Sequence, residues 1–331
     1  MKFAVAKLAA VLFVGLLAAP TVAEAQQTGR VWRIGLMTTS PRPPSSGFLD
    51  ELRSLGYIEG QNLIVDWRHT AGSIERRSRE ARSLMAWKPD VVVGITASDG
   101  QTLHDSDPGV PIVLASAGVD LVRAGIVASL ARPGGSITGI QILQQDTAPK
   151  RLLILKELMP HLQRVAVLHA SSSISTAVAN HNTRLFELLD VTARTLVVGV
   201  RGFPAAPGDD LDRIFAEMKR NADVLMIDTT PQIWGRRSEL SELIRRYRMP
   251  VMYDSSDWLE DSGLVSYGPN IGAVWQRAAH FVDRILKGGK PADMPIEQPR
   301  NFELIINART AKALDLKIPQ HMLLLADRII E

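Results

Sequence analysis

Small polar and charged residues follow most of the short apolar runs in this sequence, where the strands of an α/β protein would end. Hydroxyl groups and free N–H groups at such positions bind a carboxylate or a similar anion, and a carboxylate binds an ammonium group. The alternative interpretation is that these side chains only cap the following helices. We expect capping for any single residue and ligand binding for the set, which comprises Thr38, Ser40, Ser98, Ser116, Asp120, Gln141, His169, Asp228, Asp254 and Tyr267.

The sequence lacks the residues that several kinds of catalytic chemistry require. The chain has no cysteine, so thiol nucleophiles, cysteine-ligated zinc and disulfides are excluded. It also lacks a phosphate-binding P-loop and any histidine pair with metal-ligand spacing. The segment 135–139 differs from a nucleophile elbow in the position of its serine and is predicted to be a turn entering a strand. The sequence therefore predicts a binding protein rather than an enzyme, with no cofactor and no metal.

The charge balance gives little support for a nucleic-acid partner. The chain holds 38 Lys and Arg against 35 Asp and Glu, a formal net charge of +3. Two arginine clusters, at 76–82 and 245–248, lie opposite apolar stripes and have acidic neighbours. We expect both clusters to be solvated helix faces, since nucleic acid requires a contiguous basic patch.

The first 25 residues are typical of a secretory signal peptide. Lys2 and Lys7 precede an uncharged run at 8–19, which Pro20 ends, and small residues follow at 23–25. The run is too short to span a bilayer, which takes about 20 residues. We expect cleavage after Ala25 and a periplasmic location.

The mature chain alternates predicted strands and helices. Continuous Val- and Ile-rich runs are typical of strands buried on both faces of a parallel sheet, and apolar residues at helical spacing lie between them. The predicted strands are 34–37, 63–65, 91–95, 112–115, 165–168, 196–200, 224–227 and 251–253, and the clearest helical stripes are 48–55, 211–218, 240–247 and 271–285. This alternation favours open, doubly wound parallel sheets.

The series occurs twice, which predicts an α/β protein with two doubly wound lobes joined by a hinge with three crossovers. Irregular stretches near 147–150, 267–270 and 288–300 separate the parts. We expect one lobe from residues 30–145 plus 271–300. Residues 146–270 plus 301–331 then form the second lobe and the hinge crossovers.

The sequence also resembles a known family, the TrpX-like substrate-binding proteins of ABC transporters, which have a type I periplasmic-binding-protein fold. The stretches that carry the resemblance are FLDELRSLGYIEGQNLIVDWR at 48–68, KPDVVVGIT at 88–96, GIVASLARPGGSITGIQ at 125–141, RLLILKELMPHLQRVAVLH at 151–169, GLVSYGPN at 263–270 and the segment 277–319. It departs from the family pattern at 118–120 and 168–170, so the resemblance assigns no aromatic specificity.

This resemblance implies a cleft that closes on a small solute, such as an amino acid or another small carboxylate. The partners implied are that solute and a membrane permease driven by a cytoplasmic ATPase. A periplasmic sensor that docks on a membrane signalling receptor is the alternative, because it would share the fold. A secreted hydrolase or a structural envelope protein is disfavoured by the motifs absent above and by the polar strand ends.

Overall fold

The structure is a computed structural model that describes residues 30–39, 47–71 and 73–331. The predicted signal peptide and the candidate Ser40 lie outside the described residues. Within those ranges, no helix has the length and apolar character that crossing a bilayer requires.

The first sheet has five parallel strands: β1 (Trp32–Thr38), β2 (Leu63–His69), β3 (Val91–Gly94), β4 (Ile112–Ala117) and β5 (Ile137–Gln141). Their order across the sheet is β2-β1-β3-β4-β5. All four residues of β3 are buried, as expected for a parallel strand with helices on both faces.

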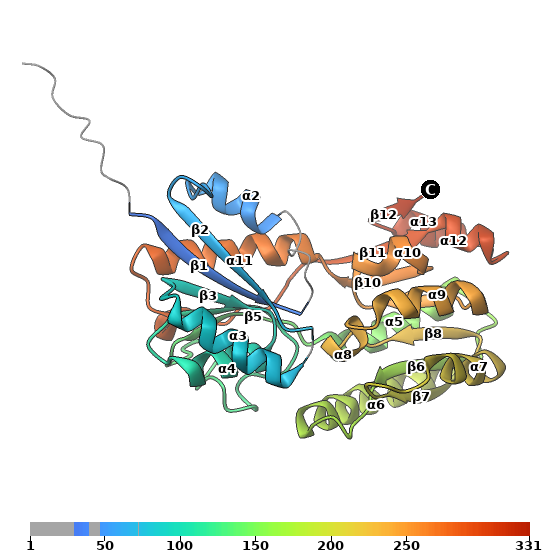
Figure 1. Cartoon of the computed structure of the whole chain (residues 1–331). Coiled ribbons are helices and arrows are strands. Elements are labelled where there is room, and N and C mark those ends of the chain that lie inside the picture. Colours follow the sequence, from blue (N-terminus) through green and yellow to red (C-terminus); the bar gives the residue numbers. More distant parts are fainter. Residues whose placement is uncertain (1–29, 40–46, 72) are drawn as a thin grey trace, which may run out of the picture.

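Four helices cover this sheet (Figure 1). Helices α2 (Gly47–Ser54) and α11 (Ile271–Leu286) share one core with one face of the sheet, while α3 (Ile74–Ala86) and α4 (Ala97–Ser106) share a second core with the other face. The apolar stripe of α11 therefore packs on the first sheet although it lies far along the chain, and Trp275 meets Phe48 of α2 edge to face at 5.8 Å.

The second sheet has seven strands: β6 (Arg164–Ala170), β7 (Gly199–Ala205), β8 (Val224–Ile227), β9 (Val251–Tyr253), β10 (Val265–Pro269), β11 (Phe302–Asn307) and β12 (Arg328–Ile330). Their order is β12-β11-β10-β9-β8-β6-β7. The pairing is parallel except between β10 and β11, which makes this sheet mixed.

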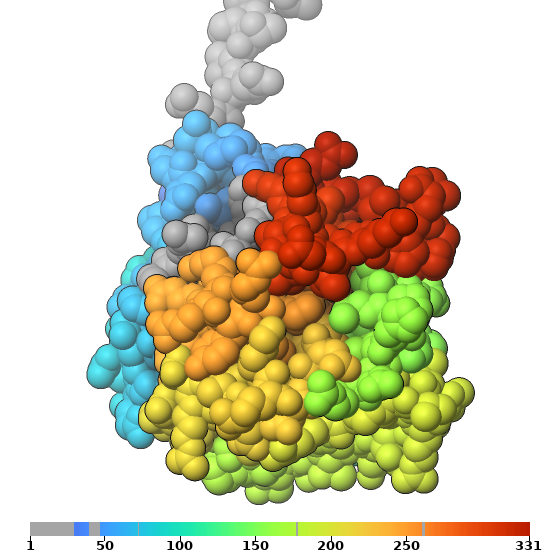
Figure 2. All heavy atoms as spheres, turned by 90° about the vertical axis from the view of Figure 1, so that its right-hand side faces the viewer, coloured from blue at the N-terminus to red at the C-terminus, as the bar shows by residue number. Residues whose placement is uncertain are grey.

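Helices cover both faces of the second sheet as well. One face carries α5 (Ala148–Leu158), α6 (Thr176–Leu196), α12 (Ala308–Ala313) and α13 (Gln320–Leu325). The other carries α7 (Leu211–Asn221), α8 (Pro231–Trp234), α9 (Arg237–Tyr247) and α10 (Leu259–Ser262). The C-terminal segment, red in Figure 2, lies on the surface of this lobe.

The chain passes between the two sheets three times. It passes from β5 through the short helix η1 (Gln144–Thr147) into α5, from β10 back to α11, and after η3 (Pro291–Asp293) into β11. Two parallel-sheet α/β lobes joined in this way confirm the predicted fold class (Figure 1). The residue numbers at which the domains divide stay a prediction.

Most element predictions agree with the structure, and two are wrong. The stretch 267–270, expected to be irregular, lies mostly in strand β10 and pairs with β11. Strands β8 and β9 have the predicted bounds. The strand predicted at 196–200 is instead a helix end followed by a later strand. Leu196 ends α6, Val197 adopts a left-handed conformation with φ 54, and β7 begins at Gly199. The apolar run misled the prediction because it spans the helix C-terminus and the strand start.

Candidate functional site

Strand order places two candidate regions at corresponding points of the lobes. In the first sheet β1 lies between β2 and β3, and in the second sheet β6 lies between β7 and β8. In the first sheet β2 is therefore added on one side of β1 and β3 on the other, and in the second sheet β7 and β8 flank β6 in the same way. We call the places between β1 and β3 and between β6 and β8 the reversal points. Crevices at the carboxyl ends of such strand pairs are where open α/β sheets bind ligands.

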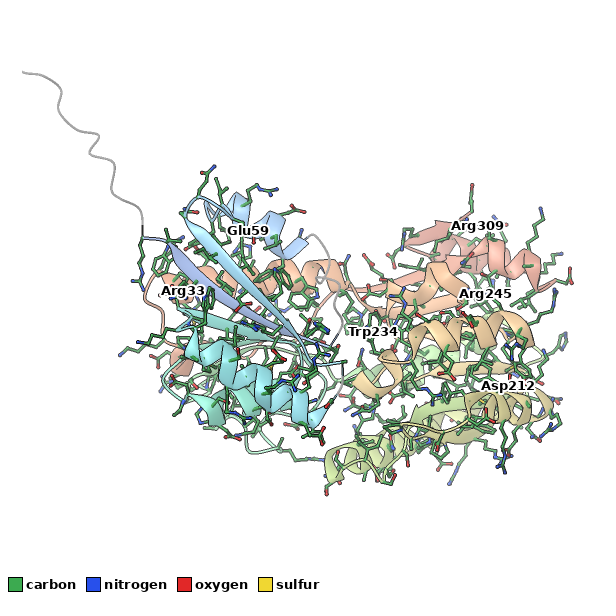
Figure 3. The ribbon with its side chains drawn as sticks, viewed as in Figure 1. Arg33, Glu59, Asp212, Trp234, Arg245 and Arg309 are labelled. Atoms are coloured by element: carbon green, nitrogen blue, oxygen red, sulfur yellow. The ribbon has the colours of Figure 1, made fainter. Side chains whose placement is uncertain are left out.

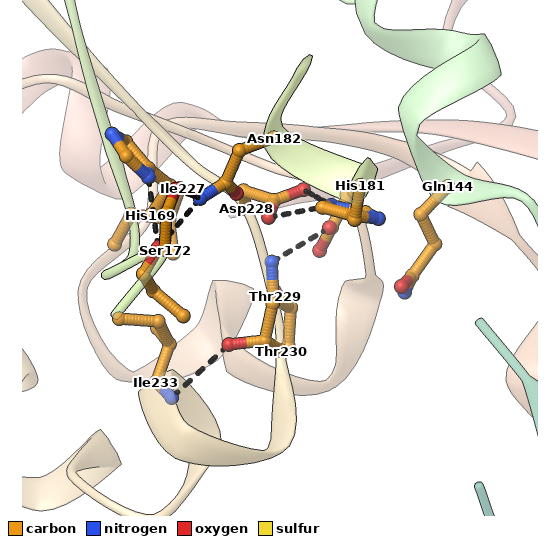
Figure 4. A network of polar contacts seen from close by, with 12 residues as sticks. Gln144, His169, Ser172, His181, Asn182, Ile227, Asp228, Thr229, Thr230 and Ile233 are labelled. Carbon is orange, nitrogen blue, oxygen red and sulfur yellow. Dashed lines mark hydrogen bonds and ion pairs between the residues drawn. The ribbon is translucent and has the colours of Figure 1, made fainter. Parts of the chain in front are cut away.

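A histidine–aspartate pair occupies the reversal point of the second lobe (Figure 4). Asp228 follows β8, and its two carboxylate oxygens lie 3.0 and 2.9 Å from Nε2 of His181, which α6 supplies. Asp228 is only 2% exposed. A carboxylate in so little water needs a partner of this kind.

A second buried pair lies next to the first. Arg151 of α5 and Asp254 after β9 are 1% and 0% exposed, and their charged groups lie 3.9 Å apart. The guanidinium also donates to the carbonyl oxygens of Ile227 and Gln144, at 3.4 and 3.3 Å. Asp254 accepts the Thr229 N–H at 2.9 Å, which fixes the loop after β8.

His169 is the penultimate residue of β6, on the other side of the reversal point. It is 7% exposed, and its Nδ1 lies 2.9 Å from the carbonyl oxygen of Ala170. Its ring packs edge to face on Phe186 at 5.1 Å. Asn182 of α6 donates to the same carbonyl and to the Ser172 hydroxyl, at 2.9 and 3.0 Å. This strand end is therefore held from two sides.

Burial and neighbouring charges shift the pKa values of these groups in different directions. Burial would lower the pKa of His181, but the hydrogen bond and charge of Asp228 outweigh it and raise that pKa above its usual value. Burial lowers the pKa of His169 and raises the pKa of the Asp254 carboxyl. Opposed shifts within one cluster are typical of functional sites.

Buried polar atoms without hydrogen-bond partners gather at this end of the second sheet. Native proteins leave few such atoms, and each one calls for a water, an ion or a ligand. The atoms are Gln145 Oε1, Arg151 Nε, Asn182 Oδ1, Thr229 Oγ1, Gln232 Oε1, Asp254 Oδ1, Trp258 Nε1 and Ser266 Oγ. Among them, Asn182 and Thr229 directly follow His181 and Asp228 in the chain, and Arg151 and Asp254 form the neighbouring ion pair.

The corresponding end of the first lobe contains a buried ion pair. Arg77 of α3 is 9% exposed, Asp99 of α4 is 0% exposed, and they approach within 3.0 Å. The prediction that the whole 76–82 arginine cluster is a solvated face is therefore wrong for Arg77. Its helix begins at the carboxyl end of β2 beside the start of α4, which turns this side chain inward.

The candidates in the first lobe lie at the strand ends but serve mainly local structure. Thr38 is buried and donates to the carbonyl oxygen of Arg68 at 3.5 Å. Gln141 is buried and accepts the Leu121 N–H at 2.8 Å, and Asp120 accepts two backbone N–H groups of its own turn. Ser116 is half-buried and Ser98 is exposed. Whether these residues touch a ligand stays a prediction.

Aromatic rings border the polar cluster of the second lobe. Trp258 is fully buried between Tyr253 and Trp234, with ring centroids 5.2 Å from each. Trp234 ends α8 and lies on the side of the second lobe that faces the first (Figure 3). Tyr267 of β10 is half-buried and stacks on Phe302 of the returning strand at 5.9 Å.

The second lobe also has two surface pockets, which are lined by other residues than the candidate contacts at the strand ends. One of about 760 Å³ is lined by α6 and β7 residues, including Phe186, Leu189 and Val198. The other, of about 300 Å³, is lined by residues of α9 and α12 with Ser262. Neither pocket contains a candidate contact residue, so the strand ends remain the stronger candidate for solute binding.

The sequence prediction missed the residues that complete the network. His181, Arg151 and Asn182 lie inside helices, far along the chain from the strand ends, and they reach the site only after α5 and α6 pack on the sheet. Asp228 is 47 residues from His181. A polar side chain interrupting an otherwise apolar helix face was the only available signal.

Comparisons with known proteins agree with this architecture. Residues 42–330 match the family described as ABC transporter substrate binding protein. A tyrosine-binding protein of Clostridioides difficile (strain R20291) is 22% identical over 272 residues, which cover 82% of this chain and 76% of that protein.

Solved structures show the same fold. A conserved domain protein from Vibrio cholerae superposes with a TM-score of 0.80 at 23% identity, covering 91% of this chain and 100% of that one. An ABC domain from Streptococcus pneumonia in complex with L-Trp gives 0.79 at 23% identity, covering 90% and 99%. Because the family match spans most of the sequence, the chain belongs to the ABC transporter substrate-binding protein family.

Proposed function

We propose that this protein captures a small solute, an α-amino acid or a similar small carboxylate, outside the cytoplasm and delivers it to a membrane permease driven by a cytoplasmic ATPase. The solute binds between the lobes, which close on it as two bodies about the three chain crossings. Closure requires that the solute bind the closed arrangement more tightly than the open one.

One observation carries the proposal: buried polar atoms without hydrogen-bond partners gather at the carboxyl ends of the strands in both lobes. In the first lobe these include Thr70 Oγ1 and Arg76 Nε, near the buried Arg77–Asp99 pair. In the second they include Asn182 Oδ1 and Thr229 Oγ1, on the residues that follow His181 and Asp228 in the chain. A bound solute would supply the missing partners and relieve the desolvation cost of these groups.

Charge and shape support an amino acid as the solute. Arg77 offers a cation in one lobe, and Asp228 offers a carboxylate in the other. Trp234 presents a ring on the side of the second lobe that faces the first (Figure 3). One relative is named a tyrosine-binding protein, and a different protein of this fold was solved in complex with L-Trp. Tyrosine and tryptophan are therefore the first amino acids to test.

Calorimetric titration of the purified protein with the twenty standard amino acids tests the proposal. We expect one solute molecule to bind per chain and to be recovered unaltered by mass spectrometry. Small carboxylates without an amino group form the second panel. Failure of every compound in both panels to bind, or chemical conversion of the solute, would contradict the proposed function.

A further inference from the structure

His181 and a bound cation have the same target, the carboxylate of Asp228. Nε2 of His181 lies 2.9 and 3.0 Å from the two Asp228 oxygens, so a single ring nitrogen serves both of them. The side chains of His181 and Asp228 are 11% and 3% exposed. An ammonium group that reaches Asp228 must therefore share the carboxylate with the imidazole or replace it.

Charges around this carboxylate balance when His181 is protonated. Asp228 and Asp254 are the two acids of the cluster, and Arg151 of α5 and protonated His181 of α6 are its two cations. His169 of β6 adds no charge at neutral pH, because burial lowers its pKa.

Two further acids on nearby short helices each have an arginine partner. Asp257 of the short helix η2 (Ser256–Trp258) feels the charge of Arg237. Asp146 of η1 lies 3.7 Å from Arg184, and both are about half exposed. The charges that act on His181, those of Asp228, Asp254 and Arg151, therefore sum to zero with the charge of the protonated imidazole itself.

An extra cation disturbs this balance. A positive charge added to a buried, neutral cluster is costly, because little water is present to solvate it. Loss of one proton from His181 restores neutrality and frees the Asp228 oxygens. His181 is the group able to make this change near neutral pH, because imidazole is the side chain that exchanges a proton in that range.

We propose that binding of an ammonium-bearing solute at Asp228 displaces the His181 imidazole and releases its proton to solvent. This inference rests on the proposed function. Before binding, the imidazolium donates to the carboxylate; afterwards the ammonium group donates to it and the imidazole is neutral. His181 is thus a positioning and specificity-determining residue, since a solute without a cationic group has no means of displacing it.

Proton release can be counted by calorimetry in two buffers with different ionisation enthalpies, phosphate and Tris. The probe is L-tyrosine or, if another standard amino acid binds more tightly, that amino acid. At a pH well below the pKa of His181 we expect about one proton released per solute bound. Affinity should then rise by up to about tenfold per pH unit and level off above that pKa.

Two comparisons isolate the histidine and the ammonium group. His181→Gln keeps a hydrogen-bonding side chain without a titrating proton, so it should bind the probe with no proton release. The exposed His161→Gln is the matched control and should behave like the unaltered protein. The analogue 3-(4-hydroxyphenyl)propionate, which lacks the ammonium group, should release no proton and bind at least about tenfold more weakly than L-tyrosine.

The outcomes separate the two proposals. Identical heats in the two buffers with tight amino-acid binding would overturn proton release while leaving the proposed function standing. Undiminished proton release from a folded His181→Gln would also overturn the inference. Absence of binding by every amino acid would remove both proposals. The buffer comparison uses the unaltered protein, so the test stands even if the variant fails to fold.

Discussion

The two lobes have the same strand order, but different side chains lie at their reversal points. In the first lobe the strand ends carry hydroxyls and acids that mostly satisfy nearby backbone groups, as Thr96 and Asp99 do in the capping box of α4. Each lobe has a buried arginine–aspartate pair at this place, Arg77–Asp99 in the first and Arg151–Asp254 in the second, and the second lobe adds the His181–Asp228 pair. On the proposed function, the second lobe therefore recognises the ammonium group of the solute through Asp228, and the first lobe offers the Arg77 cation and completes the enclosure.

The largest effect on stability should come from Arg151→Met. The change leaves Asp254 buried and uncompensated, so the free energy of unfolding should fall by about 3–5 kcal/mol. Urea denaturation measures it. Arg164→Met is the matched control: it removes an arginine that is 54% exposed and paired with Asp223, and should cost less than about 1 kcal/mol. Equal losses in the two variants would refute the contrast between buried and exposed pairs.

Solute affinity should depend on Asp228 of the second lobe more than on Asp120 of the first. Asp228→Asn should weaken amino-acid binding by at least about thirtyfold, near 2 kcal/mol, because the neutral amide cannot compensate an ammonium group. Asp120→Asn, which alters a turn in the first lobe, should change affinity less than about threefold. Calorimetric titration of both variants checks this, and similar losses would remove the proposed division of roles.

Stability should depend on pH through His181. Its pKa is raised in the folded protein above the ordinary 6.5, so its contribution is fully present below about pH 6.5 and disappears as pH rises through the raised value. His181→Asn should therefore cost about 1.5 kcal/mol at pH 6 and less at pH 8, measured by denaturation at both pH values. A cost that grows with pH would contradict the direction of this linkage.

The smallest effect should come from the capping box of the first lobe. Thr96→Ala removes the hydroxyl that accepts the Asp99 N–H at 3.1 Å, and should cost about 1 kcal/mol of stability. Solute affinity should remain within about threefold of the unaltered protein. Ser98→Ala, at the exposed second residue of the same helix, should leave stability unchanged. A large loss of affinity in Thr96→Ala would show that the first lobe contacts the solute more closely than we propose.

The sequence predicted the framework better than the site. The sequence predicted strands β8 and β9 and helix α11 correctly. Continuous or helically spaced apolar residues must be buried, and their pattern shows which element buries them. Those patterns are local, so they were readable without the fold. The failure at 196–200 came from an apolar run that crosses an element boundary.

Site chemistry depends on contacts between residues far apart in the chain. Nothing near Asp228 in the sequence indicates that His181 will meet it, and Arg77 looks like its exposed neighbours until α4 packs beside α3. The carboxyl ends of the strands predicted where these buried polar groups lie, since strand order fixes the positions of the reversal points. The partners that set charge and pKa there required the tertiary structure.

The central claim is that the two lobes close around a small solute, and small-angle X-ray scattering tests it most directly. We predict that the radius of gyration of the protein decreases when L-tyrosine, or the best-binding amino acid, is added to saturation. The decrease should follow the calorimetric binding curve. An unchanged radius of gyration at full occupancy would contradict the account, because the solute would then bind without bringing the lobes together.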